Sequence, residues 1–128
     1  MGFWGKASDT VDPLGPKESS ADIIDPAREI SIDMTTDERS AMLDEPDINQ
    51  RILSPAARAA LWSAAPHPGG VPSSWLTCSI EVARELQTWA KAGMDRWKVA
   101  DPAKSVIFRS AARQIRFALW KVGAGPAP

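Results

Sequence analysis

The stretch "DPAKSVIFRSAARQIRFALWKVG", residues 101–123, predicts a long amphipathic helix. Asp101 followed by Pro102 is typical of a helix start, and Gly123 is typical of a helix end. At about 100° per residue, the apolar residues of this stretch fall on one side of the helix. This predicted core face consists of Ile107, Phe108, Ala111, Ala112, Ile115, Ala118, Leu119 and Val122. We therefore predict a helix over about 102–122 that buries one face.

The opposite side of the same helix is basic and aromatic. Arg109, Arg113 and Arg116 form a row, and Phe117 and Trp120 flank it. Solvated helix faces usually mix charges of both signs, and this helix has no acid after its first residues. Because like charges three or four residues apart repel each other, we expect the row to have a partner. The chain's own acidic half, another protein's acidic surface, nucleic-acid phosphates and an anionic membrane surface all remain open.

The residues before this helix predict a second long helix, packed against it as an antiparallel hairpin. Apolar residues recur at helical spacing over about 73–98, and Ser73 or Thr77 is a candidate cap. The connection to the last helix is short, which is typical of helices that lie side by side. Ser54 and Pro55 begin an alanine-rich segment that predicts a shorter helix near 55–65.

The front of the chain predicts an extended acidic arm with at most one short helix. Pro, Gly, Ser and Asp are spread through its first residues without helical or strand periodicity. Thr35 and Glu38 have the spacing of a capping box and predict the short helix. We interpret the adjacent aromatics Phe3 and Trp4 as an anchor that docks on a partner, and the alternative is that they fold back onto the protein's own helices.

The predicted fold class is all-α. The predicted organisation is an acidic arm over 1–46, a helical domain over 47–123 and a frayed tail over 124–128. Two long helices and a short one cannot bury all six tryptophans of the chain. Part of the apolar surface is therefore expected to meet another chain. Four of the tryptophans, at apolar helical positions, are interpreted as core or subunit-interface residues: Trp62, Trp75, Trp89 and Trp97.

The charges of the chain are strongly divided between its two halves. Residues 1–50 hold four cations and twelve acids, whereas residues 51–128 hold eleven cations and four acids. This division favours an acidic protein surface, either the chain's own arm or a partner, as the counterpart of the arginine row. Nucleic acid ranks second as the counterpart of the arginine row. The reason is that nucleic-acid-binding domains usually have a pI above about 9, whereas this chain has a pI near 5.8.

The sequence offers no motif for catalysis, a metal or another cofactor. His67 and Cys78 are the only histidine and cysteine, and a structural zinc site needs four ligands. Cys78 near a helix start is a candidate for a lowered thiol pKa, but a small, partly buried residue is the favoured interpretation. No apolar run predicts a membrane span or a secretory signal, and a single cysteine favours a reducing compartment.

These observations predict a non-enzymatic structural or adaptor subunit of a larger assembly, either homo- or hetero-oligomeric. A phage virion component, such as a head-tail connector or tail-associated protein, is one concrete form, and a small regulator that docks on a larger enzyme is another. The predicted location is cytoplasmic or virion-associated. The partner-binding residues are expected to be Phe3, Trp4, Arg109, Arg113, Arg116, Phe117 and Trp120. The alternative is a small nucleic-acid-binding or regulatory protein that uses the arginine face.

Overall fold

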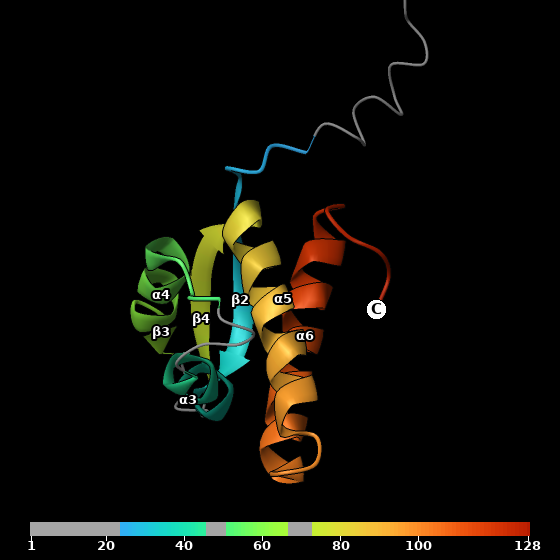
Figure 1. Ribbon diagram of the computed structural model, residues 1–128. Coiled ribbons are helices and arrows are strands. Elements are labelled where there is room, and N and C mark those ends of the chain that lie inside the picture. Colours follow the sequence, from blue (N-terminus) through green and yellow to red (C-terminus); the bar gives the residue numbers. More distant parts are fainter. Residues whose placement is uncertain (1–23, 46–50, 67–72) are drawn as a thin grey trace, which may run out of the picture.

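The computed structural model describes residues 24–45, 51–66 and 73–128 of the chain. Two long helices stand side by side and pack against a small sheet, and two short helices cover the rest of the same core (Figure 1). In chain order the elements are β2 (Glu29–Thr35), α3 (Thr36–Asp44), α4 (Pro55–Trp62), β3 (Ala65–Pro66), β4 (Ser73–Ser79), α5 (Ile80–Trp97) and α6 (Pro102–Lys121).

The sheet has three antiparallel strands in the order β2-β4-β3. β2 and β4 pair along their whole length, with Ile32 opposite Leu76 and Ile30 opposite Cys78. Along β2 the apolar residues alternate with exposed polar ones, which is the pattern of a strand with one buried face. The sheet therefore turns one face to the core and leaves the other open.

The sheet corrects two sequence-based predictions. The hairpin helix expected over 73–98 is wrong for residues 73–79, which form β4, and α5 begins only at Ile80. The extended arm expected over 1–46 is wrong for residues 29–35, which form β2, whereas the one short helix expected within it is α3, and both elements lie within the folded body. In both segments buried and exposed residues alternate, and the two strands pair with each other across the sheet. This long-range pairing decides the secondary structure even where the apolar residues are also spaced as on a helix. Helices still account for most of the described structure, so the all-α prediction holds only coarsely.

The helices begin at the caps that their sequences provide. Thr35 accepts a hydrogen bond from the Glu38 backbone, and Glu38 returns one, which completes the predicted capping box of α3. Ser79 caps α5 by accepting from the Val82 backbone, and Asp101 caps α6 by accepting from Lys104. The predicted hairpin of α5 and α6 is present, and the predicted short helix near 55–65 is α4.

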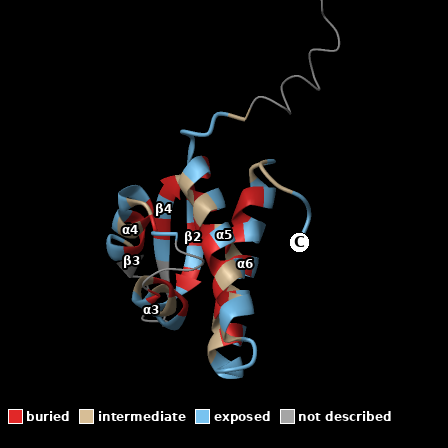
Figure 2. Cartoon of the chain, in the orientation of Figure 1, coloured by how far each residue is buried: buried red, intermediate tan, exposed pale blue. Residues whose placement is uncertain are grey.

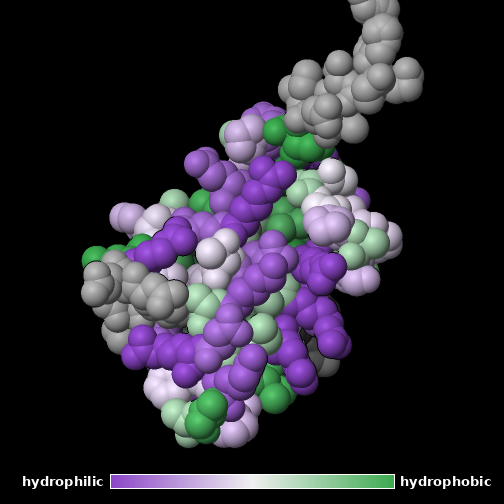
Figure 3. Space-filling view, turned by 45° about the vertical axis from the view of Figure 1, so that its right-hand side comes forward, coloured by the Kyte–Doolittle hydropathy of each residue, from purple (hydrophilic) through white to green (hydrophobic). Residues whose placement is uncertain are grey.

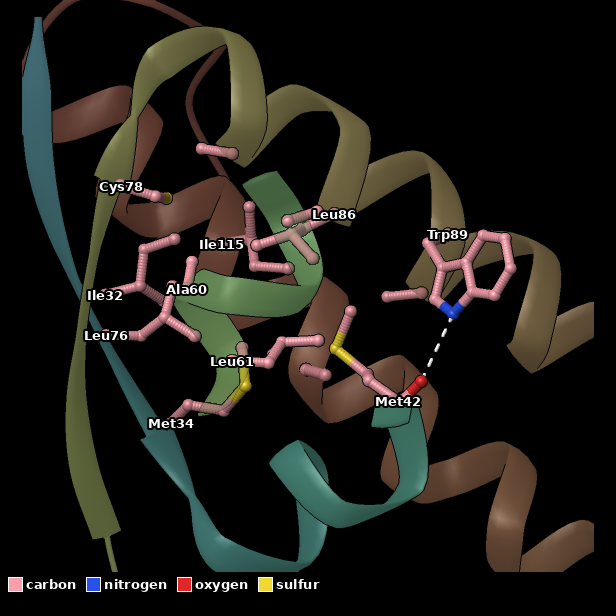
Figure 4. Close-up of a cluster of buried hydrophobic side chains, with 14 of the residues drawn as sticks. Ile32, Met34, Met42, Ala60, Leu61, Leu76, Cys78, Leu86, Trp89 and Ile115 are labelled. Carbon is pink, nitrogen blue, oxygen red and sulfur yellow. Dashed lines mark hydrogen bonds between the residues drawn. The ribbon is translucent and has the colours of Figure 1, made fainter. Parts of the chain in front are cut away.

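The core lies between the buried face of the sheet and the inner sides of the helices (Figure 2). Side chains from β2, β4 and all four helices of the described residues meet there, including Ile32, Leu76, Leu86 and Ile115 (Figure 4). Trp89 closes one side and donates from its indole nitrogen to the carbonyl of Met42 at 3.4 Å. Of the residues predicted for the core face of α6, Ile107 and Val122 are only partly buried and the others are buried.

The two long helices pack tightly at Gly93 of α5. A methyl group placed on this glycine would lie only 2.5 Å from Cδ1 of Phe108, a fully buried side chain of α6. Real Cβ atoms do not come so close to another carbon, so glycine is required here by space rather than by its backbone angles. None of the helices in the described ranges is long and apolar enough to cross a membrane.

Candidate partner-binding surfaces

The predicted arginine row lies exposed on the outer side of α6. Together with residues of α5 it borders a groove of about 370 Å³ between the two helices. We name this the α5–α6 groove, and its lining residues are Gln87, Lys91, Met94, Arg109, Ala112, Arg113, Arg116 and Pro128. Hydrophilic side chains crowd the face of the molecule on which these helices lie (Figure 3). All three predicted arginines are thus brought to one concave site, which also has a lysine on its facing wall.

The groove has a strong positive charge that the described part of the chain does not neutralise. Four of its eight lining residues are cations and none is an acid. Within residues 24–45, 51–66 and 73–128, no carboxylate lies within 4.0 Å of Lys91, Arg109 or Arg113. The expected pairing with the chain's own acids is therefore not seen for the acids that the structure describes.

Instead, three glutamates are used as hydrogen-bond acceptors inside the fold. Glu38 accepts from the Thr35 backbone at 2.9 Å and from the Ser110 hydroxyl of α6. Glu85 accepts from both the backbone and the hydroxyl of Ser54, at 2.7 Å and 2.6 Å. The Glu38–Ser110 bond and the Glu85–Ser54 bonds tie the short helices to the long ones, because they join segments far apart in sequence.

Glu45 is the third of these glutamates. Its side chain has no solvent exposure; Oε1 accepts from the Trp97 indole at 2.8 Å, and Oε2 lies 3.0 Å from Nε of Arg96. Lys104 of α6 lies over the Trp97 ring, 4.2 Å from its centroid. Glu45 therefore joins the end of α3 to the last turn of α5.

The C-terminal tail lies against the groove rather than being frayed as predicted. Gly123 adopts the left-handed backbone, with φ of 77°, and turns the chain back after α6. Arg84 then donates to the carbonyl of Ala124 at 3.1 Å, and Arg116 donates to the carbonyl of Ala127 at 3.0 Å. Since Pro128 also lines the groove, the tail occupies its Arg116 end.

A second surface lies where α6 passes the open face of the sheet. The rings of Phe117 and Trp120 are in contact, with centroids 5.6 Å apart, and the Lys121 ammonium lies 5.4 Å from the Phe117 centroid. Phe117 and Lys121 border a hollow of about 270 Å³ with Trp75 of β4. We name this the aromatic pocket; its lining residues are Ser31, Asp33, Trp75, Gln114, Phe117, Ala118 and Lys121.

The tryptophans predicted as core or interface residues divide between buried and exposed positions. Trp89 is buried and Trp97 is partly buried beside Glu45. Trp75 and Trp120 are 46% and 45% exposed around the aromatic pocket, and Trp62 at the end of α4 is 68% exposed. The predicted surplus of tryptophan at the surface is therefore real for three of the five that the structure describes.

Sequence reasoning missed two parts of these surfaces. Lys91 forms the facing wall of the groove, and its position follows only from the pairing of α5 with α6. Trp75 contributes to the aromatic pocket because residues 73–79 form a strand, whose alternation of exposed and buried residues would have been the signal. The predicted anchor, Phe3 and Trp4, lies outside the described residues, as does His67.

The setting of the single thiol, Cys78, disfavours its ionisation. Cys78 is buried in β4, and its burial, together with the nearby charge of Glu29, raises the pKa of the thiol to about 11. A lowered pKa at a helix start, which the sequence left open, is therefore wrong. Over the ranges that the structure describes, no group of three or more His, Cys, Asp or Glu residues is placed to hold a metal ion.

Comparisons with known proteins add no relative to this description. The chain matches no protein-family model, and neither the curated proteins nor the solved structures yield a match.

Proposed function

We propose that this protein is a non-enzymatic, protein-binding subunit of a larger assembly, and that it docks on its partner through the outer side of α6. The sheet and the hairpin form a rigid body, and α6 presents the aromatic pocket on one side and the arginine row on the other. Aromatic residues and arginine are the residue types most enriched at protein interfaces and their hot spots.

The aromatic pocket is the observation that carries this proposal. Phe117 and Trp120 expose 43% and 45% of their surface and contact each other on α6, and Phe117 also borders the pocket with Trp75 of β4. Water disfavours exposed apolar surface by about 25 cal/mol per Å², so the adjoining rings of Phe117 and Trp120 are best stabilised by a partner that covers them. Single exposed apolar residues such as Val99 need no such explanation.

The chemistry of the remaining side chains supports a binding role rather than catalysis. Glu38, Glu45 and Glu85 are engaged in hydrogen bonds that hold the helices, and the thiol of Cys78 is buried with a raised pKa. A virion component and a regulator that docks on a larger enzyme are both forms that this proposal allows. The docking of Phe3 and Trp4 on a neighbouring subunit stays a prediction.

Nucleic-acid binding is a second candidate function, and one observation favours it. The arginine row and Lys91 lack carboxylate partners in the described residues, and phosphates would neutralise them. Trp120 beside the row is placed to stack on a base. Against this stands the low pI of the whole chain, near 5.8.

The test is the size of the complex that the tagged protein forms in an extract of its source, measured by sedimentation. We expect the wild type to migrate far above its own mass, and Phe117→Gln/Trp120→Gln to return it to the monomer position. Ile52→Gln/Trp62→Gln is the matched control, since it removes two more strongly exposed apolar side chains on a different face. A wild type that migrates as a monomer, or an equal loss in the control, would overturn the proposal.

A further inference from the structure

The α5–α6 groove has the features of a peptide-binding site, and this inference rests on the proposed protein-binding function. We propose that the groove binds an acidic, extended segment of the partner protein, and that the chain's own C-terminal tail occupies one end of it. The aromatic pocket and the groove would then be two separate contact sites on α6, one for apolar and one for acidic side chains of the partner.

The arrangement of charge fits carboxylates. Arg109, Arg113 and Arg116 form one wall over a length of about 10 Å, given the rise of 1.5 Å per helical residue. Lys91 stands on the facing wall, and no acid lines the groove. Each guanidinium presents a planar pair of N–H groups that matches the two oxygens of a carboxylate. A segment with several Asp or Glu residues would therefore neutralise the row.

The tail shows that the groove accepts a peptide backbone. Arg116 donates to the carbonyl of Ala127, Arg84 donates to the carbonyl of Ala124, and Pro128 lies against the lining. These are contacts to an extended, Pro-containing segment that carries no acidic side chain. The tail engages Arg116 and leaves Arg109, Arg113 and Lys91 without a carboxylate in the described part of the molecule.

Two features favour an acidic peptide over a nucleic acid. Met94 and Ala112 lie between the cationic walls and provide an apolar contact for aliphatic side chains, which a phosphate backbone does not have. The Trp120 ring, which would have to stack on a base, is already in contact with Phe117, with the ring centroids 5.6 Å apart.

The test measures fluorescence anisotropy of a short fluorescein-labelled peptide of Glu residues interspersed with Leu, titrated with the full-length protein. We expect the Glu peptide to bind and the same peptide with Gln in place of Glu to bind at least about tenfold more weakly, since salt-bridged hydrogen bonds would be lost. The variant Lys91→Gln/Arg109→Gln/Arg113→Gln should lower the affinity for the Glu peptide by about tenfold or more. Gln keeps the helix propensity while it removes the charge.

A matched control removes the same number and kind of charges elsewhere. Arg28→Gln/Arg51→Gln/Lys98→Gln also replaces two arginines and one lysine, all of them exposed and none of them in the groove. We expect less than about a twofold change in this control, because exposed charges away from the site act only through screened long-range attraction. An equal loss in both triple variants would show that bulk charge, not the groove, binds the peptide.

The tail provides an independent readout. A protein that stops after Gly123 should bind the Glu peptide about threefold more tightly, because Arg116 no longer has to exchange a bonded carbonyl for the ligand. Weaker binding by this shortened protein would overturn the proposed place of the tail.

A short oligothymidine, titrated in the same way, separates the two ligand classes. Tighter binding of the oligothymidine than of the Glu peptide, lost in the groove variant, would overturn the peptide in favour of nucleic acid. Absence of binding to both probes would overturn the groove as a site. In either case Phe117→Gln/Trp120→Gln still tests the proposed function separately, since those side chains do not line the groove.

Discussion

The acids near α3 and the cations of α6 stand in opposite situations. Glu38 and Glu45 are buried, and each side chain has two partners: the cap residue Thr35 and Ser110 of α6 for Glu38, and Trp97 and Arg96 of α5 for Glu45. Arg109 and Arg113 are exposed, and in the described residues neither has a carboxylate within 4.0 Å. The acids have become part of the internal framework, whereas the cations remain available at the surface.

The difference shows that a division of charge along a sequence does not imply that the two halves neutralise each other. Of the twelve acids in residues 1–50, seven lie in the described part of the chain, and none of these reaches the arginine row. The buried carboxylates accept mostly neutral hydrogen bonds from backbone, hydroxyl and indole groups. Net charge counted along the chain therefore says little about which charges are free to bind a partner.

The largest expected effect is the loss of stability when an inner acid is removed. Glu38→Ala leaves the Ser110 hydroxyl and the Thr35 backbone N–H without their acceptor and opens a cavity between α3 and α6. We expect the free energy of unfolding, measured in urea, to fall by about 3 kcal/mol. The control is Asp37→Ala, an exposed acid in the same helical turn, which should lower it by less than about 1 kcal/mol. Equal losses in the two variants would mean that Glu38 acts only as a helix-end charge.

Removal of the second inner acid should have a somewhat smaller effect. Glu45→Ala removes the hydrogen-bond acceptor of the Trp97 indole. The Arg96 side chain, which is 42% exposed, can replace its contact with Glu45 by hydrogen bonds to water. We expect a loss of about 2 kcal/mol in the same urea measurement. Glu45→Gln keeps an acceptor for the indole and should lose about half as much. Equal losses for Gln and Ala would show that the ion pair, not the indole bond, dominates.

The third prediction concerns the buried thiol of Cys78, which the fold holds in its neutral form. Its pKa is raised to about 11 in the folded protein, so the unfolded chain releases the thiol proton first as the pH rises. The stabilisation is fully present below about pH 9 and is lost as the pH rises toward 11, by an amount on the order of 1 to 2 kcal/mol. Unfolding in urea at several pH values should show this decline in the wild type and not in Cys78→Ala. A parallel decline in both proteins would assign it to other groups.

The smallest expected change concerns the outer cations. Arg109→Gln/Arg113→Gln should leave the free energy of unfolding within about 0.5 kcal/mol of the wild type, or raise it slightly, because it relieves repulsion along α6. Added salt should lessen the difference between the two proteins. A loss above about 1 kcal/mol would instead show that the row pairs with acids of its own chain, as the sequence alone favoured.

The parts of the fold that could be predicted are those set by local signals. The ends of α6 follow from Asp101 and Gly123, the start of α3 follows from the Thr35 capping box, and both depend on residues within one turn. β4 could not be separated from α5 in this way, since Leu76 and Ile80 are also spaced as on a helix. The strand is decided by its pairing with β2, which lies more than 40 residues earlier in the sequence.

The candidate surfaces show the same limit. The arginine row was predictable because its members share one helix, and helical spacing alone brings them together. The groove was not, because Lys91 reaches it only through the packing of α5 on α6, and Trp75 reaches the aromatic pocket only through the sheet. Sequence patterns thus find the residues of one element, whereas a concave site between elements depends on tertiary contacts.

The close approach of the two long helices at Gly93 has a consequence for how this surface could change in evolution. Gly93 and Phe108 lie in the core, yet their sequence neighbours Met94 and Arg109 line the groove. The size of the side chain at position 93 therefore sets the separation of the groove's two walls without touching any ligand. A lineage that placed alanine there, with a smaller residue than phenylalanine at 108, would obtain a site of different width while keeping every charge in place. The selectivity of the surface is in this way adjustable from inside the molecule.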